Sequence, residues 1–342
     1  MLQRQVDLRP FNTLALPGRA AEYVRVDAAA TLADPRWRSR RRFVLGGGSN
    51  LVLGGDFDGL ILHMAIPGRR LVAEDAQAWY IEAGAGENWH ALVLWSLARG
   101  WPGLENLALI PGTVGAAPVQ NIGAYGVEIS DFVQQVRAWD FQAAKFVEFN
   151  NAACHFAYRD SLFKKNGQHR EGALAIVALT LRLPKSWQPN CRYADVAQEL
   201  AAHEIATPTA QEIAAAVIAV RQRKLPDPGR LPNAGSFFHN PVVCAEQAAA
   251  LLRAYPELPT YPQADGRVKL AAGWLIEAAG WKGKALGPVG MYEKQALVLV
   301  NHGGATGQDV AQSMAAVQAA VRAQFALELT PEPVFLSAAN TA

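Results

Sequence analysis

Four polar side chains stand where the local sequence has no evident structural need for them, and their chemistry is anion recognition and proton transfer. Arg159, in FAYRDS, follows a strand-like stretch, and its guanidinium can bind a carboxylate or enolate through two parallel hydrogen bonds. Ser236, in NAGSFF, presents a hydroxyl in a turn between glycine and phenylalanine. Lys224 lies just past a predicted helix, and Glu332 lies between two prolines, whose stiffness could direct its carboxylate inward.

Each of these side chains also has an ordinary structural interpretation. Arg159 could form a surface ion pair with the adjacent aspartate, and Ser236 could simply cap a turn. Lys224 could interact with a helix dipole, and Glu332 could be a solvated residue of the C-terminal tail. The sequence has no G-x-S-x-G motif, so it does not predict a serine hydrolase.

Two glycine-rich segments could bring backbone amides close to a ligand. Residues 110–126 (IPGTVGAAPVQNIGAYG) are rich in glycine and proline and nearly uncharged, which favours a rigid loop that could bind a diphosphate or a flat heterocycle. The alternative is an ordinary surface loop. Gly46, Gly47 and Gly48 form a turn between two strand-like runs. The dinucleotide motif G-x-G-x-x-G fails here, because Leu51 replaces the third glycine, so a Rossmann domain is not the first choice.

Composition narrows the classes of protein and partner. The 342 residues are enough for about two domains, and 51% of them are hydrophobic, as in a globular protein. The formal net charge is +2 and the one basic cluster, residues 36–42, is short, so we expect no nucleic-acid partner. The N-terminus lacks an apolar signal segment and no apolar run is long enough to span a membrane, so we expect a soluble cytoplasmic protein.

Cysteine and histidine spacing predicts neither disulfides nor a metal site. Cys154, Cys191 and Cys244 are odd in number and far apart, which suits buried thiols in a reducing compartment. The seven histidines show no metal-binding spacing.

The elements that must position these residues are mixed. Strand patterns precede and follow Gly46–Gly48, include WYIEAGAG, and recur between residues 133 and 183. Helices are expected at residues 88–99, 209–223 and 308–325; in the second, Thr209 and Glu212 form a capping box. Prolines at residues 184–193 mark a boundary.

Taken together, these motifs resemble one family, the UDP-N-acetylenolpyruvoylglucosamine reductases, which are flavoenzymes of peptidoglycan synthesis. The resemblance runs from end to end through NTLALPG, GGGSNLVL, IPGTVGAAPVQNIGAYG, FAYRDS, KLPDPG, NAGSFFHNP, AAGWLIE, QALVLVN and the final Glu332. Tyr193, in CRYADV, is similar to the substrate-closing tyrosine of the type I form. The resemblance implies an α+β fold with a two-part FAD-binding region of the vanillyl-alcohol-oxidase-like (PCMH-type) fold and a separate α/β substrate-binding domain. It implies boundaries at residues 1–65, 66–205 and 206–330, with 331–342 returning to the active site.

The resemblance also implies roles for individual residues. NADPH would reduce the bound FAD, and UDP-N-acetylglucosamine enolpyruvate would then be reduced to UDP-N-acetylmuramate by a monomeric enzyme. Arg159 and Glu332 would contact the substrate carboxylate, and Ser236 would donate the proton. The residues implied to contact FAD are Gly46, Gly47, Gly48, Ser49, Asn50, Ile110, Pro111, Gly112, Gly115, Gln120 and Gly123. Those implied to bind substrate or NADPH are Tyr193, Lys224, Asn240 and Gln295.

A few positions depart from the family pattern without removing a proposed catalytic group. Pro333-Val334 stand where an apolar residue and then arginine are frequent, His239 stands where lysine is common, and Ala116-Ala117 replace frequent serines. The alternative enzyme is another FAD-dependent oxidase or dehydrogenase of the same fold acting on an alcohol or sugar. A flavin- or nucleotide-sugar-binding protein without turnover is a third interpretation, and it would leave Arg159, Ser236 and Glu332 without a role.

Overall fold

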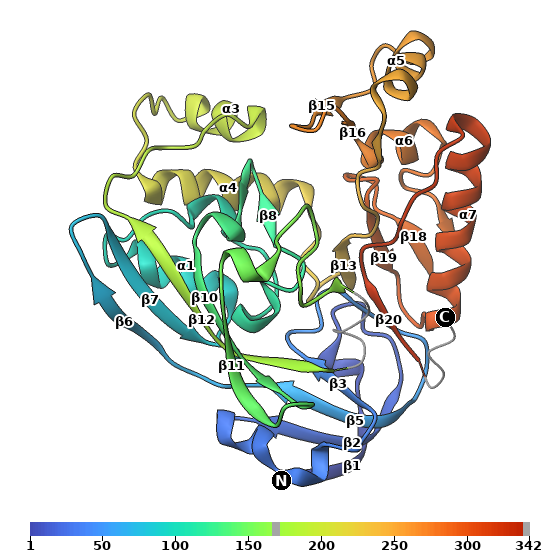
Figure 1. The fold of residues 1–342 in the computed structure, drawn as a ribbon. Coiled ribbons are helices and arrows are strands. Elements are labelled where there is room, and N and C mark those ends of the chain that lie inside the picture. Colours follow the sequence, from blue (N-terminus) through green and yellow to red (C-terminus); the bar gives the residue numbers. More distant parts are fainter. Residues whose placement is uncertain (166–171, 338–342) are drawn as a thin grey trace. The chain divides into compact units, whose positions relative to one another are not determined.

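The computed structural model describes residues 1–165 and 172–337 and shows two compact units (Figure 1). Unit 1 consists of Met1–Val6, Ala20–Gly48 and Phe57–Arg223. Unit 2 consists of Asp7–Arg19, Ser49–Asp56 and the chain from Lys224 onward. Each unit therefore contains segments far apart in sequence. The three-part division expected from the sequence remains a prediction, and part of its returning segment, residues 338–342, lies outside the described residues.

A four-stranded sheet begins unit 1. Its strands are β1 (Leu2–Asp7), β2 (Arg19–Val26), β5 (Phe57–Met64) and β3 (Arg42–Leu45), in that order, and β5 pairs in parallel with both neighbours. Leu60, Ile61 and Leu62 are fully buried in β5. A continuous apolar run of this kind is typical of a parallel strand that is covered on both faces.

A five-stranded antiparallel sheet forms the larger part of unit 1. Its order is β11 (Lys145–Asn150), β10 (Val133–Asp140), β12 (Leu174–Pro184), β7 (Ala78–Gly84) and β6 (Arg69–Glu74). The strands expected between residues 133 and 183 are therefore confirmed. Trp139, Phe141, Ala175 and Val177 pack with Leu60, Leu62 and Met64, so a hydrophobic core joins the two sheets.

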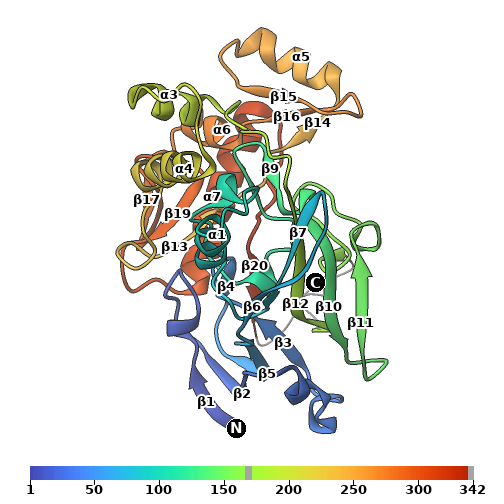
Figure 2. The same ribbon diagram turned by 90° about the vertical axis from the view of Figure 1, so that its left-hand side faces the viewer.

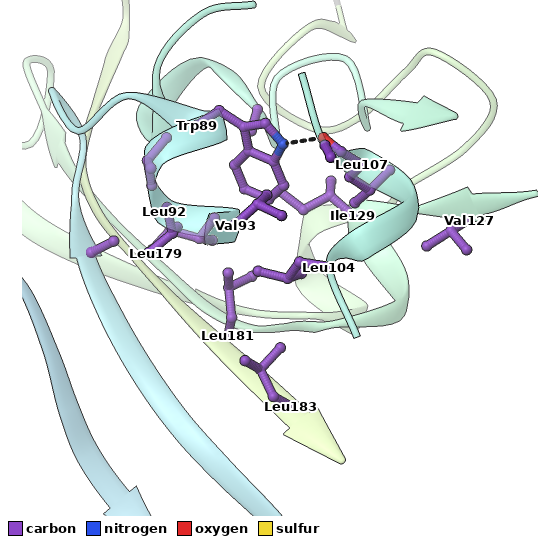
Figure 3. Packing of buried hydrophobic residues seen from close by; sticks show 14 of the residues in the cluster. Trp89, Leu92, Val93, Leu104, Leu107, Val127, Ile129, Leu179, Leu181 and Leu183 are labelled. Atoms are coloured by element: carbon purple, nitrogen blue, oxygen red, sulfur yellow. Dashed lines mark hydrogen bonds between the residues drawn. The ribbon is translucent and has the colours of Figure 1, made fainter. Parts of the chain in front are cut away.

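A second core of unit 1 lies beneath its helices. Helix α1 (Trp89–Leu97) begins where the Asn88 side chain accepts a hydrogen bond from the amide of Ala91. The Trp89 indole is buried in this core and donates to the carbonyl of Leu107 at 2.9 Å (Figure 3). Helix α4 (Ala210–Lys224) contributes Ile213 and Val217 to the same core.

The predicted capping box of α4 is present, since the Glu212 amide donates to Thr209 Oγ1 at 3.2 Å and the Thr209 amide donates to Glu212 Oε2 at 2.7 Å. Helix α3 (Ala194–Ala202) was not anticipated from the sequence. The remaining short strands of unit 1, β8 (Gly123–Ala124) and β9 (Val127–Glu128), form a small hairpin.

The described part of unit 2 contains three small sheets and the helices α5, α6 and α7. The first sheet runs β13 (Asn233–Ser236), β19 (Val298–Asn301), β18 (Val289–Met291) and β17 (Ala285–Leu286). Helix α7 (Gly307–Phe325) lies along this sheet (Figure 1) and begins with a capping box formed by Thr306 and Asp309. The second sheet contains β14 (Val242–Val243), β16 (Val268–Leu270) and β15 (Thr260–Pro262). The other helices are α5 (Ala245–Ala254) and α6 (Ala272–Ala278).

A parallel pair of short strands joins distant parts of unit 2. Strand β4 (Leu51–Leu53) pairs with β20 (Val334–Leu336), and the two lie side by side in Figure 2. This pairing positions the segment that contains Glu332. Within residues 1–165 and 172–337, no helix combines the length and apolar character that crossing a membrane requires.

Candidate active site and family assignment

The two glycine-rich segments of unit 1 approach each other so closely that side chains would collide. A Cβ on Gly46 would lie 2.7 Å from Thr113 Oγ1, and one on Gly47 would lie 3.0 Å from the Cα of Gly112. Thr113 Oγ1 is itself buried without a hydrogen-bond partner in the protein. A close backbone approach and an unsatisfied hydroxyl are features expected where a bound cofactor completes the structure, so these residues fit the predicted FAD.

The turn that leads into α1 holds the start of loop 110–126. The amide of Gly115 donates to the carbonyl of Ala85 at 2.9 Å, and the amide of Trp89 donates to the carbonyl of Gly112 at 3.1 Å. A Cβ on Gly115 would lie 2.6 Å from the Cβ of Ala85. The amide of Gly115 is therefore already used within the protein, and Ala85 occupies the space that a side chain at this position would need. The contact of Gly115 with FAD remains a prediction.

His90 fixes the residue that precedes this loop. Its Nδ1 accepts a hydrogen bond from the amide of Leu109 at 3.0 Å, and Leu109 has a left-handed backbone with φ 59°. Burial lowers the pKa of His90, and the nearby charge of Arg221 lowers it further. Both effects favour the neutral imidazole, which is the form that can accept this hydrogen bond.

Arg159 is held against loop 110–126. Its Nη2 donates to the carbonyl of Gly123 at 2.7 Å, and its Nη1 donates to the carbonyl of Asn121 at 3.3 Å. The backbone of Arg159 is left-handed, with φ 52°. A non-glycine residue in this conformation is uncommon and costs about 1–3 kcal/mol, so the surrounding structure imposes it. The guanidinium is thereby oriented against loop 110–126.

Asn121 is a structural residue of the site that the sequence did not single out. It is fully buried and left-handed, with φ 46°. Its Nδ2 donates to Glu128 Oε2 at 2.8 Å and to the carbonyl of Ala157 at 3.1 Å, while its Oδ1 accepts from the amide of Ser130 at 3.1 Å. Asn121 therefore ties loop 110–126 to the segment that carries Arg159. The adjacent glycines and prolines were a signal for the loop, but not for this network.

Tyr193 lies beside Tyr125, near the C-terminal end of loop 110–126. Its ring packs edge-on against the ring of Tyr125, with centroids 5.2 Å apart. The segment that leads to Tyr193 is tied down twice, because Asn106 Nδ2 donates to the carbonyl of Asn190 at 2.9 Å and the Trp187 indole donates to Glu105 Oε1 at 2.6 Å. Tyr193 therefore neighbours loop 110–126.

Unit 2 brings Ser236 and Glu332 onto neighbouring main-chain segments. Ser236 is the exposed last residue of β13, and the next residue, Phe237, accepts a hydrogen bond at its carbonyl from the amide of Glu332 at 2.9 Å. A bridge between Phe238 and Pro331 extends this pairing. The buried rings of Phe237 and Phe238 anchor the segment and leave the serine hydroxyl accessible.

Glu332 is not a solvated tail residue, because its side chain is only 12% exposed. Its carbonyl accepts a hydrogen bond from Asn50 Nδ2 at 3.3 Å, and the carbonyl of Asn50 accepts one from the amide of Val334 at 3.0 Å. Its Oε2 lies 3.8 Å from Nδ1 of His239. Asn50, expected to contact FAD, therefore also positions the glutamate segment.

Asn240 and Gln295 meet at the first turn of α6. Asn240 Oδ1 accepts a hydrogen bond from the amide of Ala272 at 2.9 Å, and a Cβ on Gly273 would lie 3.0 Å from Gln295 Oε1. Asn240 thus has a structural role in addition to the predicted binding role, and Gln295 Oε1 accepts a hydrogen bond from the amide of Leu297 at 3.3 Å. Lys224 is the last residue of α4 and not, as expected, just past its end.

The predicted residues therefore form two sets. Unit 1 contains Gly46, Gly47, Gly48, Ile110, Pro111, Gly112, Gly115, Gln120, Gly123, Arg159 and Tyr193. Unit 2 contains Ser49, Asn50, Lys224, Ser236, Asn240, Gln295 and Glu332. The predicted turn at residues 46–50 thus continues from one unit into the other.

Comparisons with known proteins identify the domains to which the two ends of the chain are similar. Residues 25–150 match the model of an FAD-binding domain, and residues 227–336 match that of the C-terminal domain of UDP-N-acetylenolpyruvoylglucosamine reductase. The chain is 71% identical to the UDP-N-acetylenolpyruvoylglucosamine reductase of Dechloromonas aromatica over 97% of this chain and 98% of that one. It is 59% identical to the protein of the same name from Azoarcus sp. over 96% of both chains.

A solved structure gives the same fold. The UDP-N-acetylenolpyruvylglucosamine reductase of Thermus caldophilus aligns with a TM-score of 0.66 at 24% identity and covers 98% of both chains. The predicted fold class, an α+β FAD-binding region followed by a separate C-terminal domain, is confirmed. With identities of this size over nearly its whole length, the chain belongs to the UDP-N-acetylenolpyruvoylglucosamine reductase family.

Proposed function

We propose that this protein reduces UDP-N-acetylglucosamine enolpyruvate to UDP-N-acetylmuramate, with FAD as bound cofactor and NADPH as co-substrate. The observation that carries the proposal is the 71% identity to a reductase of this name over nearly the full length of both chains. The alternative, an oxidase or dehydrogenase acting on another alcohol or sugar, is not favoured by these relatives.

When bound, FAD supplies the hydride transfer between NADPH and the enolpyruvyl group. In this proposal Gly46, Gly47 and Gly112 provide the close approach that the cofactor needs, and Thr113 Oγ1 gains a hydrogen-bond partner. Ser49, Asn50, Ile110, Pro111, Gln120 and Gly123 complete the predicted cofactor set.

Arg159 binds the substrate carboxylate, where negative charge grows as hydride adds to the neighbouring double bond. Its two hydrogen bonds to loop 110–126 orient it before substrate arrives. One such preoriented donor is typically worth about 10²–10³ in rate. Glu332 hydrogen-bonds the same enolic carboxyl group or its proton.

Ser236 donates a proton to the carbanionic carbon. A serine hydroxyl is a weak acid, but a strongly basic carbon can accept its proton, and a positioned proton donor typically contributes about 10²–10⁴-fold in rate. Its exposed position at the end of β13 leaves the hydroxyl accessible. Tyr193, Lys224, Asn240 and Gln295 bind the diphosphate of UDP or the phosphates of NADPH.

The experiment that tests this function follows the flavin absorbance of purified protein without oxygen. NADPH should bleach the oxidised spectrum, and UDP-N-acetylglucosamine enolpyruvate should restore it. Ser236→Ala should keep the first step and slow the second by about 10²–10⁴-fold. Bleaching without recovery in the unsubstituted protein would reject the substrate, and loss of both steps in the variant would reject the role of Ser236.

We also propose that the enzyme works as a cytoplasmic monomer in peptidoglycan precursor synthesis. Sedimentation of the purified protein tests the monomer. A mass near twice 36.9 kDa would contradict it.

A further inference from the structure

A second arginine of unit 1, Arg221, lies in α4 with a donor that the protein does not use. Its Nε is buried and has no hydrogen-bond partner. Burial lowers the pKa of Arg221, as expected for a cation removed from water. Leaving a buried donor unsatisfied is destabilising, and more so when it is charged. The site therefore calls for an acceptor that the described residues do not provide.

The charge of Arg159 acts on Arg221 and does not neutralise it. Besides burial, the pKa of Arg221 responds to the hydroxyl of Tyr125, which hydrogen-bonds it, and to the charge of Arg159, which lowers it further. Neither Tyr125 nor Arg159 is a carboxylate, and the carboxylate of Asp195 acts on Tyr125, whose pKa it raises. The guanidinium groups of Arg221 and Arg159 repel each other, and the repulsion is strong because both are partly removed from water. An anion that contacts both groups would stabilise them.

Tyr125 holds Arg221 and adds a second donor. Because a guanidinium only donates hydrogen bonds, the phenol oxygen must accept from Arg221, and its own O–H is left to donate to a ligand. Burial raises the pKa of Tyr125, so the hydroxyl keeps its proton. The ring packs against Tyr193, and its carbonyl accepts from Asn106 Nδ2 at 3.2 Å. The left-handed backbone of Tyr125, with φ 50°, is thus held from several sides.

We propose that Arg221 and Tyr125 bind the carboxylate of the enolpyruvyl group together with Arg159. This inference rests on the proposed function. A carboxylate can accept from several donors at once, and a guanidinium matches its planar shape. The diphosphate of the same substrate is the other anion that could fill the position.

The two anions can be separated by comparing two ligands of the oxidised FAD-loaded protein. UDP-N-acetylglucosamine contains the diphosphate but lacks the carboxylate, whereas the enolpyruvyl substrate has both. Arg221→Gln should raise the Kd of the enolpyruvyl substrate about 30-fold, a change of about 2 kcal/mol, and leave that of UDP-N-acetylglucosamine within about threefold. Arg221→Lys should recover part of the affinity for the enolpyruvyl substrate. Titration calorimetry measures both Kd values.

Arg223→Gln is the matched control, because Arg223 lies two residues later in α4, is 58% exposed in its side chain and pairs with Glu199. It should change neither Kd. Equal losses for both ligands in Arg221→Gln would overturn the carboxylate assignment in favour of the diphosphate, and unchanged affinities would overturn the inference altogether.

If Arg221→Gln fails to retain FAD, Tyr125→Phe tests the inference instead, because this substitution removes one hydrogen-bond donor and no charge. It should weaken only the enolpyruvyl substrate, by about fivefold, and equal affinities in variant and unsubstituted protein would reject the inference. Failure of the unsubstituted protein to bind or turn over this substrate would instead reject the proposed function.

Discussion

At the scale of single residues, Arg159 combines an unfavourable backbone conformation with two hydrogen bonds to loop 110–126. Arg159→Lys keeps the charge but not the planar fork that reaches both carbonyls. We expect flavin reoxidation by substrate to slow by about 10²–10³-fold, with FAD retained. Stopped-flow absorbance measures this rate, and Arg137→Lys, on the exposed side of β10, serves as the control. A variant that turns over normally would show that charge alone is sufficient.

Cys154 gives a prediction about stability in alkali. Burial raises the pKa of its thiol from 9.0 to about 11, whereas an unfolded thiol keeps the lower value. The folded state therefore holds a proton that the unfolded state loses between these pH values. The contribution of the Cys154 thiol to the free energy of unfolding is fully present below pH 9. About 2 kcal/mol of that free energy is lost as the pH rises toward 11.

Urea unfolding at several pH values tests this prediction. Cys154→Ala should be less stable at neutral pH because it leaves a small cavity, but it should lose less stability than the unsubstituted protein above pH 9. Cys244→Ala, at an exposed position, should keep the full alkaline loss. Identical alkaline slopes for all three proteins would exclude Cys154 as the cause.

At the scale of elements, the two glycine-rich segments of the proposed cofactor site lie in close contact. Gly46→Ala places a Cβ 2.7 Å from Thr113 Oγ1 and 3.1 Å from the Cβ of Ala116, so one segment must move. We expect FAD affinity to fall at least about tenfold, which is a loss of about 1.4 kcal/mol. Flavin fluorescence on titration measures it.

Gly229→Ala is the control for this substitution, because its Cβ would meet Asp227 only at 3.4 Å, an ordinary contact distance. It should bind FAD normally. Unchanged FAD affinity in Gly46→Ala would show that the close approach of the segments is not needed for the cofactor.

Protonation of His90 should destabilise the folded protein at the start of loop 110–126 as the pH falls. Because its pKa is lowered in the folded protein, the unfolded state binds the extra proton first, and stability is lost as the pH falls through about 6.5. The loss is at most about 1.4 kcal/mol per pH unit for one such group. His63, whose pKa burial also lowers, adds to the same slope.

His90→Asn separates the two histidines, because an asparagine Oδ1 can replace Nδ1 as the acceptor for Leu109 and does not titrate. Thermal unfolding between pH 5 and 7 should show a shallower pH dependence in this variant. An unchanged slope would assign the acid sensitivity to other groups.

At the scale of the whole molecule, unit 2 depends on segments from early in the chain. The amide of Asn233 donates to the carbonyl of Thr13 at 2.9 Å, and Asn301 Nδ2 donates to the carbonyl of Leu14 at 2.8 Å. Strand β4 pairs with β20. A fragment that begins at Lys224 lacks all three partners and should not fold cooperatively, although it contains most of unit 2.

The amide proton spectrum and thermal unfolding of that fragment test the prediction. Poor dispersion and no sharp transition are expected. A well-dispersed spectrum with a cooperative transition would show that the early segments are dispensable.

The sequence by itself determined much of this protein. Its long periodic elements, α4 and the strands between residues 133 and 183, lie where the sequence predicts them, because apolar period and caps are local properties. The ordered motifs identified the family, and the two glycine-rich segments were recognised as special because few other residues tolerate such close backbone approach.

Only the tertiary structure decided which residues support the site. The contact between Gly46 and Thr113, the burial of Glu332 and the unpaired donor of Arg221 each depend on chain segments far apart in sequence. The left-handed backbones of Arg159 and Tyr125 are likewise imposed by their surroundings and oppose the local preference of their residue types. Local patterns therefore specify the elements, whereas burial and unsatisfied hydrogen bonds arise only after distant segments have packed together.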